Sequence, residues 1–113
     1  MKYLGRFISQ IFVLMKNPYF ILLTLVGNTS ICIASFLFYY LEKDVNSKIS
    51  SLLDALWWGF ATATTTGYGD ITPVTQAGKI LGICLMLSGT ALFAMFTALF
   101  AEIILLSKTW GKA

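Results

Sequence analysis

The sequence predicts an all-α membrane protein in which two transmembrane helices flank a short re-entrant helix, preceded by an amphipathic helix. Three observations predict this fold class. The 113 residues are 58% hydrophobic and 12% charged, whereas about 25% of the residues in a typical soluble domain are charged. Two apolar segments are long enough to cross a bilayer. A third apolar segment, between those two, is too short to do so.

The first expected element is an amphipathic interfacial helix over residues 1–17. Apolar residues recur at helical spacing and polar residues lie mostly on the opposite face. The apolar residues are Leu4, Phe7, Ile8, Ile11, Phe12 and Met15, and the polar ones are Lys2, Arg6, Ser9, Gln10 and Lys16. Such a helix suits a membrane surface, anionic headgroups included. A secretory signal is the rival interpretation, but polar residues break the apolar run and no small-residue cleavage site follows.

The first transmembrane helix is expected over residues 18–41. Asn17-Pro18 ends the preceding helix, because the residue before a proline is driven out of α geometry and proline suits a first helical turn. Residues 19–41 carry no charge and have aromatic residues near both ends. Residues 42–51 are polar and charged, and we expect them to form a solvent-exposed extracellular loop.

A short apolar helix is expected over residues 52–64. A run of this length reads as re-entrant or buried, since it cannot span a bilayer. Ser50 or Ser51 is placed to cap its start, and Asp54 in its first turn complements the positive end of the helix dipole.

The second transmembrane helix is expected over residues 76–107, after a turn marked by Pro73. It is uncharged from residue 80 to residue 101 and contains small residues that favour close helix packing. Residues 108–113 form a tail. Because Lys and Arg residues precede the first span and follow the second, whereas acids balance the lysines between them, both termini are expected to be cytoplasmic.

The segment at residues 65–70 alternates glycine with larger residues. Successive carbonyls of an ordinary strand point to opposite sides, so a tube lined by every carbonyl needs alternate residues in left-handed geometry. Glycine adopts that geometry without a Cβ penalty. Gly67 and Gly69 alternate with Thr66 and Tyr68, so four copies could stack rings of oxygens that replace the water shell of a cation. An ordinary turn between two helices is the alternative.

These residues resemble the selectivity filter of potassium channels, and the order of elements over residues 19–106 is similar to bacterial channels with two transmembrane helices per subunit. The string that carries the resemblance is Thr65-Thr66-Gly67-Tyr68-Gly69-Asp70. The resemblance implies a homotetrameric pore of the plasma membrane. Its parts are an outer helix (18–41), a pore helix (52–64), the filter (65–70) and an inner helix (76–107), which together form a pore domain over residues 18–107. It also implies that Thr65, Thr66, Gly67, Tyr68 and Gly69 bind K⁺ as the permeant ion.

The filter departs from the family string TVGYG at one position, where Thr66 replaces valine. Val and Thr have similar shapes, so the backbone could be kept while a hydroxyl is added behind the filter. That hydroxyl needs a partner. If it has none, or bonds the neighbouring backbone, the preference for potassium over sodium is reduced.

Four further residues are implied as supports of the filter by the resemblance. Trp57 is expected to bond Asp70 and Trp58 to brace Tyr68, unless the two tryptophans are merely interfacial anchors. Ala61 stands where some members of the family carry an acid that pairs with the aspartate after the filter. Inactivation is therefore expected to be weaker, or controlled differently, than in members with the pair.

The inner helix contains candidates for a gate. Gly89 matches the hinge glycine of the family, with close packing as the alternative. Four residues fall where the inner helices are expected to converge: Thr97, Ala98, Ala101 and Glu102. Glu102 would contribute a ring of carboxylates at the inner mouth, or else pair with Lys108.

Composition also excludes several function classes. No basic cluster is interleaved with aromatic residues, so a nucleic-acid partner is not expected. The chain has no histidine and no spaced cluster of acids, so neither an enzyme nor a cofactor site is expected. The function implied is passive conduction of K⁺. The alternatives are a non-selective cation channel of the same fold and a non-conducting membrane subunit of a larger complex. The chain is expected either to be this small or to be truncated, with any missing regulatory domain on the C-terminal side.

Overall fold

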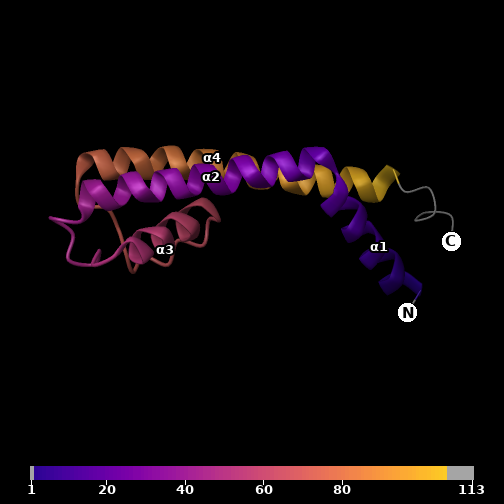
Figure 1. The fold of residues 1–113 in the computed structure, drawn as a ribbon, viewed down its shortest axis with the longest axis horizontal. Coiled ribbons are helices and arrows are strands. Elements are labelled where there is room, and N and C mark those ends of the chain that lie inside the picture. The colour runs from indigo at the N-terminus through magenta and orange to yellow at the C-terminus, as the bar shows by residue number, and fades with distance from the viewer. Residues whose placement is uncertain (1, 107–113) are drawn as a thin grey trace.

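The computed structural model describes residues 2–106 and has four helices over that range. They are α1 (Lys2–Lys16), α2 (Pro18–Glu42), α3 (Leu52–Ala63) and α4 (Gln76–Leu106). Figure 1 shows α2 and α4 side by side as a long antiparallel hairpin, with α3 packed against the end at which they are joined. The all-α prediction is confirmed. Residues 108–113, and with them the proposed Glu102–Lys108 pair, lie outside the described residues.

The break between α1 and α2 occurs at Asn17, as the sequence predicts. The Asn17 side-chain oxygen accepts hydrogen bonds from the backbone N–H groups of Tyr19, at 2.8 Å, and Phe20, at 3.3 Å. It thereby caps α2, whose first residue is Pro18. The chain turns at this point, and α1 diverges from the hairpin (Figure 1).

The core lies where α3 meets the hairpin. The Phe38 ring of α2 stacks on Trp58 of α3, with centroids 3.6 Å apart, and both side chains are buried. Gly59 permits this contact because a Cβ at that position would lie only 2.0 Å from the Ser35 hydroxyl oxygen. The aromatic stack and the close approach at Gly59 therefore help to fix the short helix against α2.

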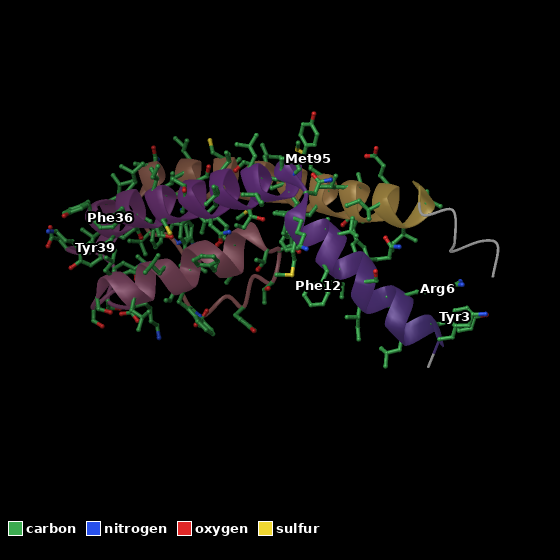
Figure 2. All side chains as sticks on the ribbon, turned by 45° about the vertical axis from the view of Figure 1, so that its right-hand side comes forward. Tyr3, Arg6, Phe12, Phe36, Tyr39 and Met95 are labelled. Carbon is green, nitrogen blue, oxygen red and sulfur yellow. The ribbon has the colours of Figure 1, made fainter. Side chains whose placement is uncertain are left out.

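Among residues 2–106, two helices are long and apolar enough to cross a membrane, judged by length and composition. They cover Pro18–Glu42 and Gln76–Leu105, with mean hydropathy of 2.0 and 2.1. Side chains project from all sides of this hairpin (Figure 2). Most large outward-facing side chains on α2 and α4 are apolar, as expected of helices surrounded by lipid or by other helices.

The expectation of a solvent-exposed loop over residues 42–51 is wrong in part. Glu42 belongs to α2 and is completely buried, and Asn46 and Ile49 are also buried. The prediction of exposure failed because a buried carboxylate can be stabilised by several hydrogen-bond donors at once. The number of polar residues in a segment does not show whether such donors are near.

Candidate functional site

The segment that follows α3 has left-handed backbone at every second residue. The φ angles are +63° at Thr65, +54° at Gly67 and +81° at Gly69. The alternation expected from the two glycines is present, and it extends one step further to a threonine. Left-handed geometry costs a residue with a Cβ about 1–2 kcal/mol, so the surrounding contacts must offset this strain at Thr65.

Two backbone hydrogen bonds tie this segment to the end of α3. Thr65 N–H donates to the Thr62 carbonyl at 3.2 Å, and Gly67 N–H donates to the Ala61 carbonyl at 3.0 Å. These carbonyls belong to the last turn of the helix, where no further residue of the helix can pair with them. A trans peptide directs its N–H and C=O to opposite sides. Because Gly67 N–H points at α3, the Thr66 carbonyl points away from α3.

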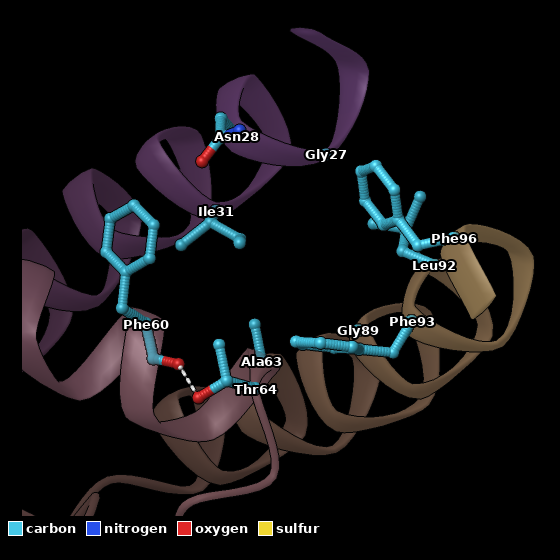
Figure 3. A pocket seen from close by; sticks show the side chains of 10 residues that line it. All are labelled: Gly27, Asn28, Ile31, Phe60, Ala63, Thr64, Gly89, Leu92, Phe93 and Phe96. Carbon is cyan, nitrogen blue, oxygen red and sulfur yellow. Dashed lines mark hydrogen bonds between the residues drawn. The ribbon is translucent and has the colours of Figure 1, made fainter. Parts of the chain in front are cut away.

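The Thr66 hydroxyl has a partner behind the segment. Its oxygen lies 2.9 Å from the Thr64 hydroxyl oxygen, and Thr64 in turn donates to the Phe60 carbonyl at 2.6 Å (Figure 3). A pocket of about 180 Å³ lies on the same side. Its lining residues are Trp57, Phe60, Ala61, Thr64, Thr66 and Tyr68.

This pocket gives the Ala61 prediction a structural basis. Ala61 is half-buried in its wall, so a longer side chain at that position would enter the space behind Thr66 and Tyr68. We expect Ala61→Glu to change the rate at which current decays during a maintained opening, because a carboxylate would form new hydrogen bonds behind the segment. Single-channel and macroscopic recordings measure this rate. An unchanged decay would remove the link between Ala61 and inactivation.

The two tryptophans of α3 have different roles. Trp57 Nε1 donates to the Asp70 carboxylate at 2.9 Å, the contact expected from the resemblance, and its ring stacks on Tyr68 with centroids 5.5 Å apart. Trp58 is buried against Phe38 and lies next to Gly82 of α4. Within one chain the expected Trp58–Tyr68 contact is therefore replaced by Trp57–Tyr68. Successive helix residues point about 100° apart, so Trp57 and Trp58 face different neighbours. Trp57 faces Tyr68 and Trp58 faces the core.

The Trp57–Asp70 bond is expected to appear as a coupling energy. Trp57→Phe keeps the ring against Tyr68 and removes only the N–H donor, while Asp70→Asn weakens the acceptor. Each variant should lower the thermal stability of the assembled protein, and the double variant should lose about 1 kcal/mol less than the sum of the two. Thermal unfolding of all four proteins in detergent measures the coupling. Strict additivity would show that the bond contributes nothing.

Glu42 is a residue that the sequence analysis missed. Its carboxylate accepts from Val74 N–H at 2.7 Å, from Thr75 N–H at 2.9 Å, from the Asn46 amide at 2.9 Å and from the Thr75 hydroxyl. The Asn46 amide also donates to the Thr72 carbonyl at 2.8 Å. Glu42 and Asn46 thus hold the stretch that runs from residue 72 to the start of α4. Glu42 is one of two acids in a polar run, and nothing in the sequence distinguishes it from Asp44.

Ser51 occupies the cap position of α3, one of the two serines expected there, but the side-chain hydrogen bonds at this end are accepted by Asp54. Asp54 accepts hydrogen bonds from the Ser50 hydroxyl at 2.7 Å and from the Ser50 and Ser51 N–H groups at 2.9 and 3.1 Å. These bonds, with the Ser50 hydroxyl contributing most, hold the pKa of Asp54 below its ordinary value. Their stabilisation is therefore full above the ordinary carboxyl pKa and is lost as pH falls through the lowered value.

Gly89 lies at the closest approach of α4 to the end of α3. A Cβ at this position would lie 2.3 Å from the Ala63 carbonyl oxygen and 2.7 Å from the Ala63 Cα. Both are backbone atoms, which cannot move aside as a flexible side chain can. A cavity of about 140 Å³ adjoins the contact, between α2, α3 and α4 (Figure 3). The geometry favours the packing interpretation of Gly89 over the hinge, and α4 is one uninterrupted helix past this point.

The four inner-mouth candidates do not share one surface. Ala98 and Glu102 line a groove of about 440 Å³ between α4 and α2, which also includes Tyr19. Thr97 and Ala101 are exposed on α4 but do not line that groove. The Thr97 hydroxyl donates to the Phe93 carbonyl at 3.0 Å, within its own helix.

A family model described as "Ion channel" matches residues 28–105, which include α3, the segment with alternating geometry and nearly all of α4. The chain belongs to the ion channel family. It is 49% identical over 70 residues to human "Potassium voltage-gated channel subfamily KQT member 4", covering 62% of this ion channel chain and 10% of that protein. It is 45% identical over 75 residues to a "Voltage-gated potassium channel" of Aeropyrum pernix, covering 62% and 25%. The match is to channels and not to enzymes, as expected.

A solved structure relates the fold of this ion channel chain to one part of such channels, the pore module. The crystal structure of a voltage-gated K⁺ channel pore module, in a closed state in lipid membranes, superposes with a TM-score of 0.62 at 35% sequence identity. The match covers 71% of this chain and 84% of that one. The predicted resemblance to a potassium channel pore domain is thus confirmed. The ion channel chain spans only 10% and 25% of the lengths of the two curated relatives named above.

Proposed function

We propose that four copies of this chain form a membrane pore that conducts potassium ions passively, with selectivity provided by the backbone of residues 65–69. The observation that carries the proposal is the left-handed geometry at Thr65, Gly67 and Gly69. In this geometry the intervening carbonyls can face one axis, and rings of such oxygens replace the hydration shell of a potassium ion. The names of the relatives support potassium as the permeant ion.

The single chain supports assembly, because one side of the segment is left open. Tyr68 is 66% exposed, and a Cβ at Gly67 or Gly69 would meet no atom within 4 Å. Non-helical backbone at membrane depth is tolerated only when protein buries it or when it lines a wet path. Further copies around an axis satisfy this condition. We place both termini on the cytoplasmic side of the plasma membrane, with Thr97, Ala98, Ala101 and Glu102 toward the inner mouth.

A flux assay tests this proposal. Purified protein in potassium-loaded liposomes should release potassium at a rate far above that of sodium from sodium-loaded liposomes. Gly67→Ala should abolish the difference, because its φ of +54° is strained for alanine even though the space is open. Gly5→Ala, which also meets no atom but lies in ordinary helix, is the matched control. Equal release of both ions would instead support a non-selective channel, and no release would support a non-conducting subunit.

We further propose that α1 lies on the membrane surface and binds anionic lipids. None of its residues is buried, and Phe7 packs edge-on against Phe100 of α4 with centroids 6.3 Å apart. Lys2 and Lys16 are exposed at its two ends. A lysine near an anionic membrane surface contributes about 1 kcal/mol to the free energy of binding to that surface.

Replacing Lys2 and Lys16 with glutamine is therefore expected to weaken binding of phosphatidylglycerol about tenfold or more. Native mass spectrometry of protein purified with bound lipid measures this change. Lys79→Gln, an exposed lysine at the start of α4, is the control. Equal lipid retention by the double variant and the parent would contradict the proposal.

A further inference from the structure

Thr64 and Thr66 form a directed pair of hydroxyl groups behind the filter segment. A hydroxyl has a single proton to donate. Thr64 lies 2.6 Å from the Phe60 carbonyl oxygen, which can only accept, so the Thr64 proton is used there. The 2.9 Å contact between the two hydroxyls must then be donated by Thr66 and accepted by Thr64. The order is Thr66 to Thr64 to Phe60.

This pair acts on the same peptide unit that faces the ions. Gly67 N–H, bonded to the Ala61 carbonyl at 3.0 Å, directs the Thr66 carbonyl away from α3. The Thr66 side chain is attached to that same peptide and is held by Thr64. Two ties to the last turn of α3, one through the backbone and one through the side chain, therefore fix one carbonyl ring of the proposed filter.

Thr66 is exposed in the single chain, and in the proposed tetramer, which would enclose it, loss of the Thr64 hydroxyl would remove this acceptor of the Thr66 proton. Thr64 is the one hydrogen-bond partner of the Thr66 side chain among the described residues. The pocket beside it is lined largely by apolar and aromatic side chains. The backbone carbonyl of Ala61 lies in the same turn of α3 and is already used by Gly67 N–H. Competition for that oxygen would release the peptide whose carbonyl must face the axis.

We infer that Thr64 is a specificity-determining residue, whose hydroxyl makes the threonine at position 66 compatible with selection of potassium over sodium. Thr64 is a positioning residue, because it acts through Thr66 and does not itself face the ions in the filter. The inference rests on the proposed function of a potassium pore. It applies to this chain because its filter contains a hydroxyl at position 66 that must be satisfied.

A double-variant cycle on ion selectivity tests the inference. Thr64→Val keeps the shape and removes the acceptor, and it should raise the sodium-to-potassium permeability ratio about fivefold, the factor that corresponds to one net hydrogen bond. Thr64→Ser keeps the hydroxyl and should match the parent. Thr66→Val removes the need for an acceptor. In that background Thr64→Val should leave the ratio unchanged.

The outcomes separate this inference from the proposed function. A parent protein that conducts without selectivity would contradict the proposed function itself. If the parent is selective, two results would overturn the role of Thr64 alone. In the first, Thr64→Val is as selective as the parent. In the second, Thr64→Val raises the sodium-to-potassium permeability ratio as much in the Thr66→Val background as in the parent. If Thr64→Val fails to assemble, assembly of Thr64→Val/Thr66→Val would support the inference, because the stranded hydroxyl is then the cause. Failure of both variants to assemble would overturn it.

Discussion

Gly89→Ala is expected to prevent the chain from folding into a stable channel. The new Cβ would lie 2.3 Å from the Ala63 carbonyl oxygen and 2.9 Å from the Ala63 carbonyl carbon, so one of the two helices must move. Overpacking of a core costs about 1–3 kcal/mol when side chains can adjust. A clash with rigid backbone should cost at least the upper end of this range, about 3 kcal/mol. Because Ala63 ends α3, the shift would also displace the filter segment.

Thermal unfolding in detergent and the yield of assembled protein measure this effect. Gly27→Ala is the matched control, since Gly27 is also buried in a membrane helix but its Cβ would meet only the flexible Leu92 side chain, at 3.4 Å. The control should change stability little. A Gly89→Ala protein with normal stability and altered opening would instead favour the hinge.

Glu42→Ala is expected to cause a loss of stability of similar size. It would remove the acceptor of three hydrogen bonds from Val74 and Thr75 and of one from Asn46. The Glu42 side chain is completely shielded from solvent at this site. Each buried donor left without a partner costs about 1–3 kcal/mol. Allowing for water that enters the vacated space, we expect a loss of about 4 kcal/mol and a detached connection between the filter and α4.

Comparison of Glu42→Ala, Glu42→Gln and Asp44→Asn in the same unfolding assay measures this contribution. Glu42→Gln keeps one acceptor oxygen but points an NH₂ group at existing donors, so its stability should lie between the parent and Glu42→Ala. Asp44 is exposed two residues away, and its replacement should change stability by no more than about 0.5 kcal/mol. Equal effects at positions 42 and 44 would show that the buried carboxylate is not a structural support.

The sequence predicted the elements because each has a strong local signal. Pro18 and the cap at Asn17 fix the start of α2, and Asp54 fixes the start of α3. The apolar lengths of α2 and α4 distinguish spans from the short α3. The helix ends are within one residue of expectation: α2 extends to Glu42 and α3 ends at Ala63 instead of residue 64, while residue 107 lies outside the described range.

The remaining features could not be predicted because they depend on contacts between distant segments. Glu42 accepts from residues more than 30 positions away. Within one chain, the contact of Trp57 instead of Trp58 with Tyr68 depends on which face of α3 meets Phe38. The left-handed geometry of Thr65 is strained for a residue with a Cβ. Residue type therefore does not predict it, and it depends on the hydrogen bonds that Thr65 and Gly67 make to the end of α3.

The central claim is that the backbone of residues 65–69 selects potassium, and reversal potential tests it most directly. Purified protein in a planar bilayer, with potassium on one side and sodium on the other, should give a current that reverses near the potassium equilibrium potential. The reversal potential of Gly67→Ala should move away from the potassium equilibrium potential, whereas that of Gly5→Ala should stay near it. A robust current through the parent protein that reverses near zero would contradict the account.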